Sequence, residues 1–216
     1  FDMWGGYYQS EAVFENLRVM RELWKKYSEG DEESLAEIAL VVDPASICYL
    51  DDSSEEITAK IHRNVRNSLN AVGAPFDVIS FNDIAALAET GEFRRYKSLY
   101  EVTSAKREIL EKFVFRAGRT VFWLYGAGLS DGETIDVARM EELTGHRFGA
   151  GDGGVVGRAM AEWNSVYAWN YDAATPAQLK CLAAEAGVTI WIDAQEPVFA
   201  NRRLACFHTA CGGVRK

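Results

Sequence analysis

The hydrophobic positions of this chain alternate between short apolar runs and longer amphipathic stretches. The runs are rich in β-branched and aromatic residues and are bounded by turn residues, which is typical of buried strands. The run at 120–125, Thr-Val-Phe-Trp-Leu-Tyr, has the strongest strand pattern. The pattern predicts strands at 36–42, 75–81, 96–102, 120–125, 165–169 and 188–192. It predicts helices at 53–72, 104–116, 134–144 and 175–186, and a short helix that ends at Ala88.

Strands that alternate with crossover helices predict a mostly parallel sheet covered by helices on both faces. The expected fold class is therefore α/β, a doubly wound, flavodoxin-like sheet. Two further short strands, 198–200 and 204–208, are joined at Asn201-Arg202. We expect them to form a hairpin that adds an antiparallel edge to the sheet.

The N-terminal region does not belong to this alternation. Residues 10–29 predict a helix whose apolar side chains form one stripe: Val13, Leu17, Met20, Trp24 and Tyr27. A charged segment, 28–33, follows as a linker. The chain begins Phe-Asp-Met-Trp-Gly-Gly without an initiator Met, so we interpret residues 1–33 as the end of a preceding domain and 34–216 as the α/β domain.

Two glycine motifs raise the question of phosphate binding. Gly149, Gly151 and Gly154 match G-x-G-x-x-G, but they follow a helix and not a strand, so residues 149–157 are predicted to be a loop without regular structure. Gly126-x-Gly128 does follow a strand but lacks the third glycine, and phosphate binding there stays an alternative.

The composition restricts the classes of partner that this chain is expected to bind. The 32 acidic and 23 basic residues give a net charge of −9, which argues against nucleic acid and against an anionic membrane. No apolar run is long enough to cross a bilayer, and the cytoplasm is the default location. The four cysteines, Cys48, Cys181, Cys206 and Cys211, show no zinc-like spacing and are predicted to be buried free thiols, so we expect neither a metal nor a cofactor.

The candidate chemistry lies where the strands end, since α/β sheets bind ligands beyond the carboxyl ends of their strands. The candidate crevice consists of Asp43, Ser46, Glu101, Tyr125 and Gly126. Trp163, Tyr167 and Trp169 alternate with other residues and form either core or a contact surface. An amidotransferase-type hydrolase would need a cysteine on a tight turn, but the turn after the strongest strand has Ala127, and Cys48 has no partner histidine in sequence.

Several strings resemble the glycoside hydrolase family 42 β-galactosidases, in which a catalytic (β/α)₈ barrel precedes a flavodoxin-like domain similar to class I glutamine amidotransferases. Residues 1–6 resemble the end of the eighth barrel strand, and the helix from Ser10 resembles the last barrel helix. Residues 186–191, Ala-Gly-Val-Thr-Ile-Trp, and 198–204, Val-Phe-Ala-Asn-Arg-Arg-Leu, resemble the end of the middle domain.

The resemblance implies a non-catalytic domain that assembles into homo-oligomers, of the trimer type found in that family, while carbohydrate binds to the barrel. It also implies that Trp4 and Asp2 line the sugar site of the intact enzyme. The chain departs from the pattern because it lacks nearly all of the barrel, including both catalytic glutamates. A sugar- or nucleotide-binding module is the alternative, and an independent amidotransferase-type hydrolase is the third.

Overall fold

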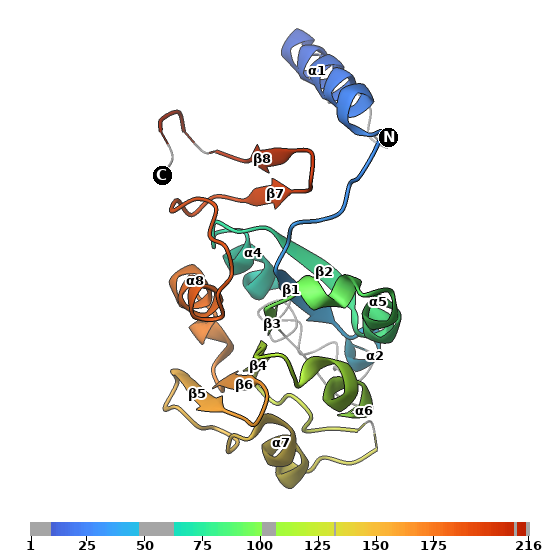
Figure 1. The fold of residues 1–216 in the computed structure, drawn as a ribbon. Helices are drawn as coiled ribbons and strands as arrows, with labels where there is room; N and C mark the ends of the chain where they lie inside the picture. The colour runs from blue at the N-terminus through green and yellow to red at the C-terminus, as the bar shows by residue number, and fades with distance from the viewer. Residues whose placement is uncertain (1–9, 48–62, 101–106, 132, 210, 215–216) are drawn as a thin grey trace.

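The computed structural model describes residues 10–47, 63–100, 107–131, 133–209 and 211–214. Its centre is a six-stranded sheet with the order β2-β1-β3-β4-β6-β5 (Figure 1). The first five strands of this order pair in parallel, and β5 at the edge runs antiparallel to β6. The predicted α/β fold class is confirmed. The bounds are β1 (Ile38–Val42), β2 (Phe76–Ser80), β3 (Ser98–Tyr100), β4 (Thr120–Leu124), β5 (Val155–Ala159) and β6 (Asn164–Ala168).

Helices cover both faces of the sheet (Figure 1). One face carries α5 (Ile84–Thr90), α6 (Arg107–Ile109) with its π-helical continuation η5 (Leu110–Val114), and α7 (Val137–Thr144). The other face carries α4 (Val65–Leu69) and α8 (Pro176–Glu185). The predicted start of α8 is confirmed, because the hydroxyl of Thr175 accepts a hydrogen bond from the Gln178 N–H at 3.2 Å. The remaining short elements are α2 (Pro44–Ile47), η3 (Phe81–Asp83), η4 (Glu92–Arg95) and η6 (Tyr171–Ala173).

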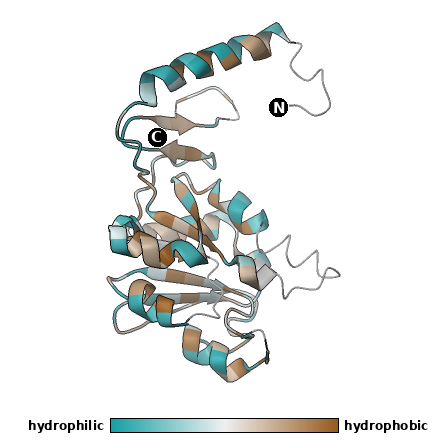
Figure 2. Cartoon of the chain, turned by 90° about the vertical axis from the view of Figure 1, so that its right-hand side faces the viewer, coloured by the Kyte–Doolittle hydropathy of each residue, from teal (hydrophilic) through white to brown (hydrophobic). Residues whose placement is uncertain are grey.

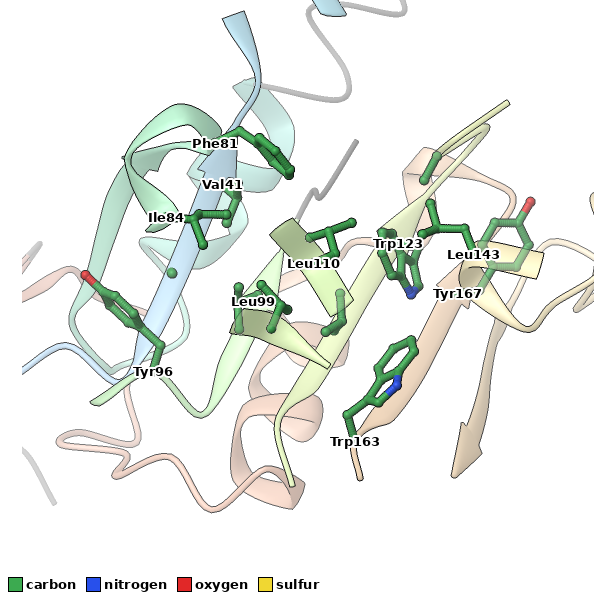
Figure 3. Close-up of a cluster of buried hydrophobic side chains, with 14 of the residues drawn as sticks. Val41, Phe81, Ile84, Tyr96, Leu99, Leu110, Trp123, Leu143, Trp163 and Tyr167 are labelled. Atoms are coloured by element: carbon green, nitrogen blue, oxygen red, sulfur yellow. The ribbon is translucent and has the colours of Figure 1, made fainter. Parts of the chain in front are cut away.

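The alternation of side chains along the strands creates two separate cores. In β4, Val121 and Trp123 belong to the core under α5, α6 and α7, while Phe122 and Leu124 belong to the core under α4 and α8. Figure 3 shows the first of these, with Ile84, Leu110 and Leu143 from three helices around the side chains of the strands.

Two of the three aromatic residues considered for an interface lie inside this first core. Both are labelled in Figure 3. Tyr167 is fully buried, and Trp163 stacks on Phe115 with ring centroids 4.1 Å apart. An exposed contact surface is therefore wrong for Trp163 and Tyr167, and the core alternative describes them. Trp169 is half-buried.

One predicted strand and part of one predicted loop are wrong. Residues 188–192 form no strand, although Val188 and Ile192 are buried and the N–H groups of Trp191 and Ile192 both donate to the Gly73 carbonyl. Conversely, the loop predicted at 149–157 gives way at Val155 to β5, which pairs with β6. Strand pattern alone could not separate these segments, because an apolar extended segment needs a neighbouring strand to become part of a sheet.

The C-terminal hairpin is present but forms its own sheet. Strands β7 (Val198–Ala200) and β8 (Ala205–Phe207) pair with each other and not with the main sheet, so the antiparallel edge of the main sheet is β5 and not the hairpin. Cys206 in β8, Cys181 in α8 and Cys211 are exposed, so their predicted burial is wrong. Cys48 lies outside the described residues.

Helix α1 (Glu11–Tyr27) stands apart from the sheet in both views (Figures 1 and 2). The predicted helix is confirmed, but none of its residues is buried. Its apolar stripe faces solvent, with Met20 at 63% and Trp24 at 68% exposure. An amphipathic helix normally gains its stability by packing such a stripe against a neighbour.

Candidate functional site

The strand order reverses between β1 and β3, and the carboxyl edge of the sheet at this switch point is the expected ligand position. Asp43 follows β1 directly, and Ser46 lies within α2. Glu101 follows β3 but lies outside the described residues, so its position relative to Asp43 stays a prediction. Asp2 and Trp4 also lie outside the described residues.

Asp43 has a local structural role. Its side chain is buried, and its Oδ1 accepts a hydrogen bond from the Ala45 N–H at 3.1 Å. A carboxylate that precedes a helix and accepts from its first turn satisfies an N–H that the helix itself cannot pair. The buried carboxylate thus anchors the turn between β1 and α2 at the edge of the sheet.

Tyr125 begins the turn after β4 in a strained conformation. Its φ is 54°, in the left-handed region that residues with a side chain seldom adopt, and its N–H donates to the Ala168 carbonyl at 2.9 Å. Such strain persists only where surrounding contacts enforce it. The turn therefore holds the Tyr125 ring in a fixed place beside the end of β6.

Three half-buried aromatic rings meet at this place. Tyr125 stacks on Trp169 with centroids 5.0 Å apart and an interplanar angle of 23°. Phe148 contacts Trp169 edge-on at 4.4 Å and Tyr125 at 6.5 Å. The crevice candidate Tyr125 and the interface candidate Trp169 are thus brought together, at the carboxyl ends of β4 and β6.

The glycines of the same turn do not form a phosphate cradle. Gly126 packs against Leu129, whose N–H donates to the Gly126 carbonyl at 2.9 Å, so the chain closes a tight turn. The next helix, α7, begins only at Val137, and its first turn is already capped by the carboxylate of Asp136. A helix N-terminus aimed at a phosphate, which such a site requires, is not formed by this turn.

A buried polar network joins α7 to β6. The Ser165 hydroxyl donates to the Thr144 carbonyl at 2.5 Å and accepts from the Trp123 indole N–H at 3.0 Å. The His146 ring lies against Tyr167, with its Nε2 3.3 Å from the Ser165 carbonyl oxygen. Because His146 contacts the carbonyl and not the hydroxyl, the pair does not form the base–nucleophile contact of a serine hydrolase.

A second polar cluster lies at the opposite, amino-terminal edge of the sheet. Asp77 of β2 accepts hydrogen bonds from the Ser34 hydroxyl at 2.9 Å, the Arg95 guanidinium at 3.0 Å and the Tyr96 phenol at 2.9 Å. Burial, with the Asp77 carboxylate adding to it, raises the pKa of the Tyr96 phenol. The cluster joins the linker, β2 and the end of η4.

An open groove of about 260 Å³ lies beside Asp77, between β2 and the hairpin. Its apolar lining includes Phe76, Phe199 and Leu204, and the linker contributes Glu32 and Ser34 to its rim.

Within the described ranges, no group of three or more His, Cys, Asp or Glu residues is arranged to hold a metal ion. In the same part of the chain, no helix is long and apolar enough to cross a membrane. The crevice candidates Asp43, Tyr125 and Gly126 therefore offer a carboxylate, an aromatic surface and backbone groups, without a visible nucleophile–base pair.

Sequence reasoning missed the Asp77 cluster and the Ser165–His146 network. Asp77 and Ser165 are single polar residues within apolar strand runs. A polar residue at an inward strand position signals a buried hydrogen-bond network, because an unpaired buried polar group is costly. That signal was present at both positions, but it does not name the partners.

No family profile and no curated protein matches this sequence. Among solved structures, the fold is similar to that of Gan42B, a GH42 β-galactosidase, with a TM-score of 0.58 and 13% sequence identity. The match covers 94% of this chain and 39% of that one, so the chain spans about two fifths of the β-galactosidase's length. At this identity the likeness shows the shared fold.

Proposed function

We propose that this chain is an accessory, non-catalytic region of a glycoside hydrolase of the β-galactosidase type. The observation that carries the proposal is α1: an amphipathic helix with an exposed apolar stripe, attached to an α/β domain whose fold matches part of a β-galactosidase. In this proposal residues 1–33 belong to the preceding catalytic barrel, and residues 34–216 form the domain that follows it. The barrel supplies the catalytic carboxylates and binds the carbohydrate, with Trp4 and Asp2 beside the sugar.

We further propose that the α/β domain mediates self-association, as a trimer or another homo-oligomer. Sedimentation velocity of the purified chain over a concentration series tests this role, and association into a defined oligomer is expected. A strictly monomeric chain at the highest concentration would contradict it.

The catalytic part of the proposal is tested separately. The 216-residue chain is expected not to hydrolyse a chromogenic β-galactoside, while the longer polypeptide encoded by the same reading frame, with a barrel upstream of Phe1, is expected to do so. A reading frame without an upstream barrel would refute the assignment to a glycoside hydrolase.

The second candidate function is binding of a sugar or nucleotide at the carboxyl edge of the sheet. The strained Tyr125 and its stack with Trp169 favour it, because aromatic faces and enforced strain recur at binding sites. A thermal-shift series with galactose, lactose and adenine nucleotides tests this candidate, with Trp169→Ala as the comparison. The absence of any shift with the unsubstituted chain would eliminate it.

A further inference from the structure

The linker between α1 and the sheet is held by the C-terminal hairpin. The Leu35 N–H donates to the Ala200 carbonyl and the Arg202 N–H to the Glu33 carbonyl, each at 3.1 Å, and Ser34 pairs with Asn201 as an antiparallel bridge. The linker therefore runs antiparallel to the chain at the end of β7, held there by one bridge. The hairpin thus has a partner in the linker, which a two-stranded sheet otherwise lacks.

Side chains reinforce this pairing. The Arg202 guanidinium contacts the Asp31 carboxylate through one nitrogen and the Glu33 carboxylate through another, each at 2.6 Å. The Arg203 side chain packs against Gly30, where an added Cβ would lie 2.5 Å from the guanidinium nitrogen. The linker is therefore attached to the hairpin from Gly30 onward.

This attachment limits the distance between α1 and the hairpin. Helix α1 ends at Tyr27 and the first ion pair is at Asp31, so four Cα steps, at most about 14 Å, separate them. A helix with its side chains is about 10–12 Å wide. The C-terminal turn of α1, with Trp24 and Tyr27 of the stripe, is therefore held near the hairpin, and a domain that packs on this end of the stripe is able to reach the hairpin as well.

The hairpin exposes an apolar surface there. Phe199 is 57% and Leu204 41% exposed, and both line the groove of about 260 Å³ whose rim the linker forms. Exposed aromatic and aliphatic side chains around a groove are typical of a contact site.

We propose that this groove is the docking site for the domain to which α1 belongs, so that one intramolecular partner covers both the α1 stripe and Phe199 with Leu204. The inference rests on the proposed function, because it requires a domain before the linker. It adds the surface that fixes the orientation of that domain, with Arg202 as the residue that positions the linker. A second copy of the chain is the competing occupant.

Hydrogen exchange followed by mass spectrometry tests the proposal on the full-length gene product, beside the 216-residue chain. Peptides covering 198–207 and 11–27 are expected to exchange roughly tenfold more slowly in the full-length protein. Phe199→Ser in the full-length protein is expected to remove most of this protection, whereas Ile135→Ser, at a 77% exposed residue outside the groove, is expected to leave it intact.

The outcomes separate the two proposals. Equal exchange of 198–207 in both proteins, with 11–27 protected in the longer one, overturns the docking groove and leaves the proposed function standing. Protection of 198–207 that appears in the 216-residue chain only as its concentration rises also overturns it, in favour of a second copy. A reading frame without an upstream domain refutes both, and the sequence of the gene shows this directly.

Discussion

The Nε of Arg119 lies 3.0 Å from the carbonyl oxygen of Tyr96, deep in the amino-terminal edge of the sheet. The same guanidinium donates to the Phe113 carbonyl at 3.2 Å and to the Phe93 carbonyl at 3.4 Å. None of the carboxylates in the described ranges forms an ion pair with it. Burial, assisted by Arg116, lowers the pKa of Arg119. One buried cation therefore ties η4 and the end of η5 to the first strand positions of β4.

Arg119→Lys is expected to lower the free energy of unfolding by about 2–3 kcal/mol, because an ammonium group cannot reach carbonyls on separate segments as the planar guanidinium does. Denaturation in urea measures the loss. Arg116→Lys, at an exposed neighbour, is the control and is expected to change stability by no more than about 0.5 kcal/mol. Equal stability of the two variants would show that the carbonyl contacts contribute little.

Gly73→Ala is expected to be strongly destabilising. Gly73 has a φ of +81°, and an added Cβ would lie 2.1 Å from the Ile192 carbonyl oxygen, a backbone atom. The left-handed strain and the forced displacement together predict a loss of about 3–4 kcal/mol. Gly91→Ala is the matched control, since Gly91 has a φ of +86° with no atom within 4 Å of the added Cβ. It is expected to cost only about 1–2 kcal/mol, and similar losses by thermal unfolding would contradict the close approach.

Stability is expected to fall with acidification through His146. Burial, with the nearby Arg158 adding to it, lowers the pKa of His146 from its ordinary 6.5, against the opposing hydrogen bond to Ser165. The unfolded chain then binds a proton more readily than the folded one, so the contribution is complete above pH 6.5 and is lost as the pH falls toward the folded pKa.

The test for His146 is the urea midpoint measured from about pH 7.5 down to about pH 5.5, above the range where carboxylates titrate. His146→Gln is expected to flatten the decline, and His208→Gln, at an exposed histidine, is expected to keep it. A decline that persists unchanged in His146→Gln would assign the pH dependence to another group.

The Asp77 cluster is expected to behave as one unit. Asp77→Asn weakens the contacts with Arg95 and Tyr96, and the loss is expected to be about 1–2 kcal/mol, since the Arg95 and Asp77 side chains keep 21% and 26% of their surface exposed. Tyr96→Phe removes one donor to the same carboxylate. The double variant is expected to lose roughly 1 kcal/mol less than the sum of the single variants. Strict additivity in denaturation experiments would show that the two groups act independently.

The sequence predicted the elements that carry their own start signals or periodicity. It failed where pairing with a distant segment determines whether a strand forms. Thr175 with Pro176, and the stripe from Val13 to Tyr27, carry their own start signals or periodicity, and both helices are present. Residues 188–192 have strand composition but lie beside Gly73 without a strand partner, whereas the glycine-rich segment before Val155 continues into a strand because β6 offers a free edge.

The candidate site was predictable in position but not in contacts. The rule that ligands bind at the carboxyl edge located Asp43 and Tyr125, and both lie there. The stack of Tyr125 on Trp169 depends on the pairing of β4 with β6, which are separated in sequence by α7 and β5. Single-sequence patterns carry no information on such long-range pairing, and the same holds for the linker that pairs with β7.

The two cores of the sheet have a consequence for how this domain tolerates change. Ile84 of α5 and Leu179 of α8 are both fully buried, but the backbone of the sheet separates them. Ile84→Val and Leu179→Ala are therefore expected to add within about 0.5 kcal/mol when combined, as thermal unfolding can measure. Because the sheet separates the two cores, substitutions in one core are expected to need no compensating substitutions in the other.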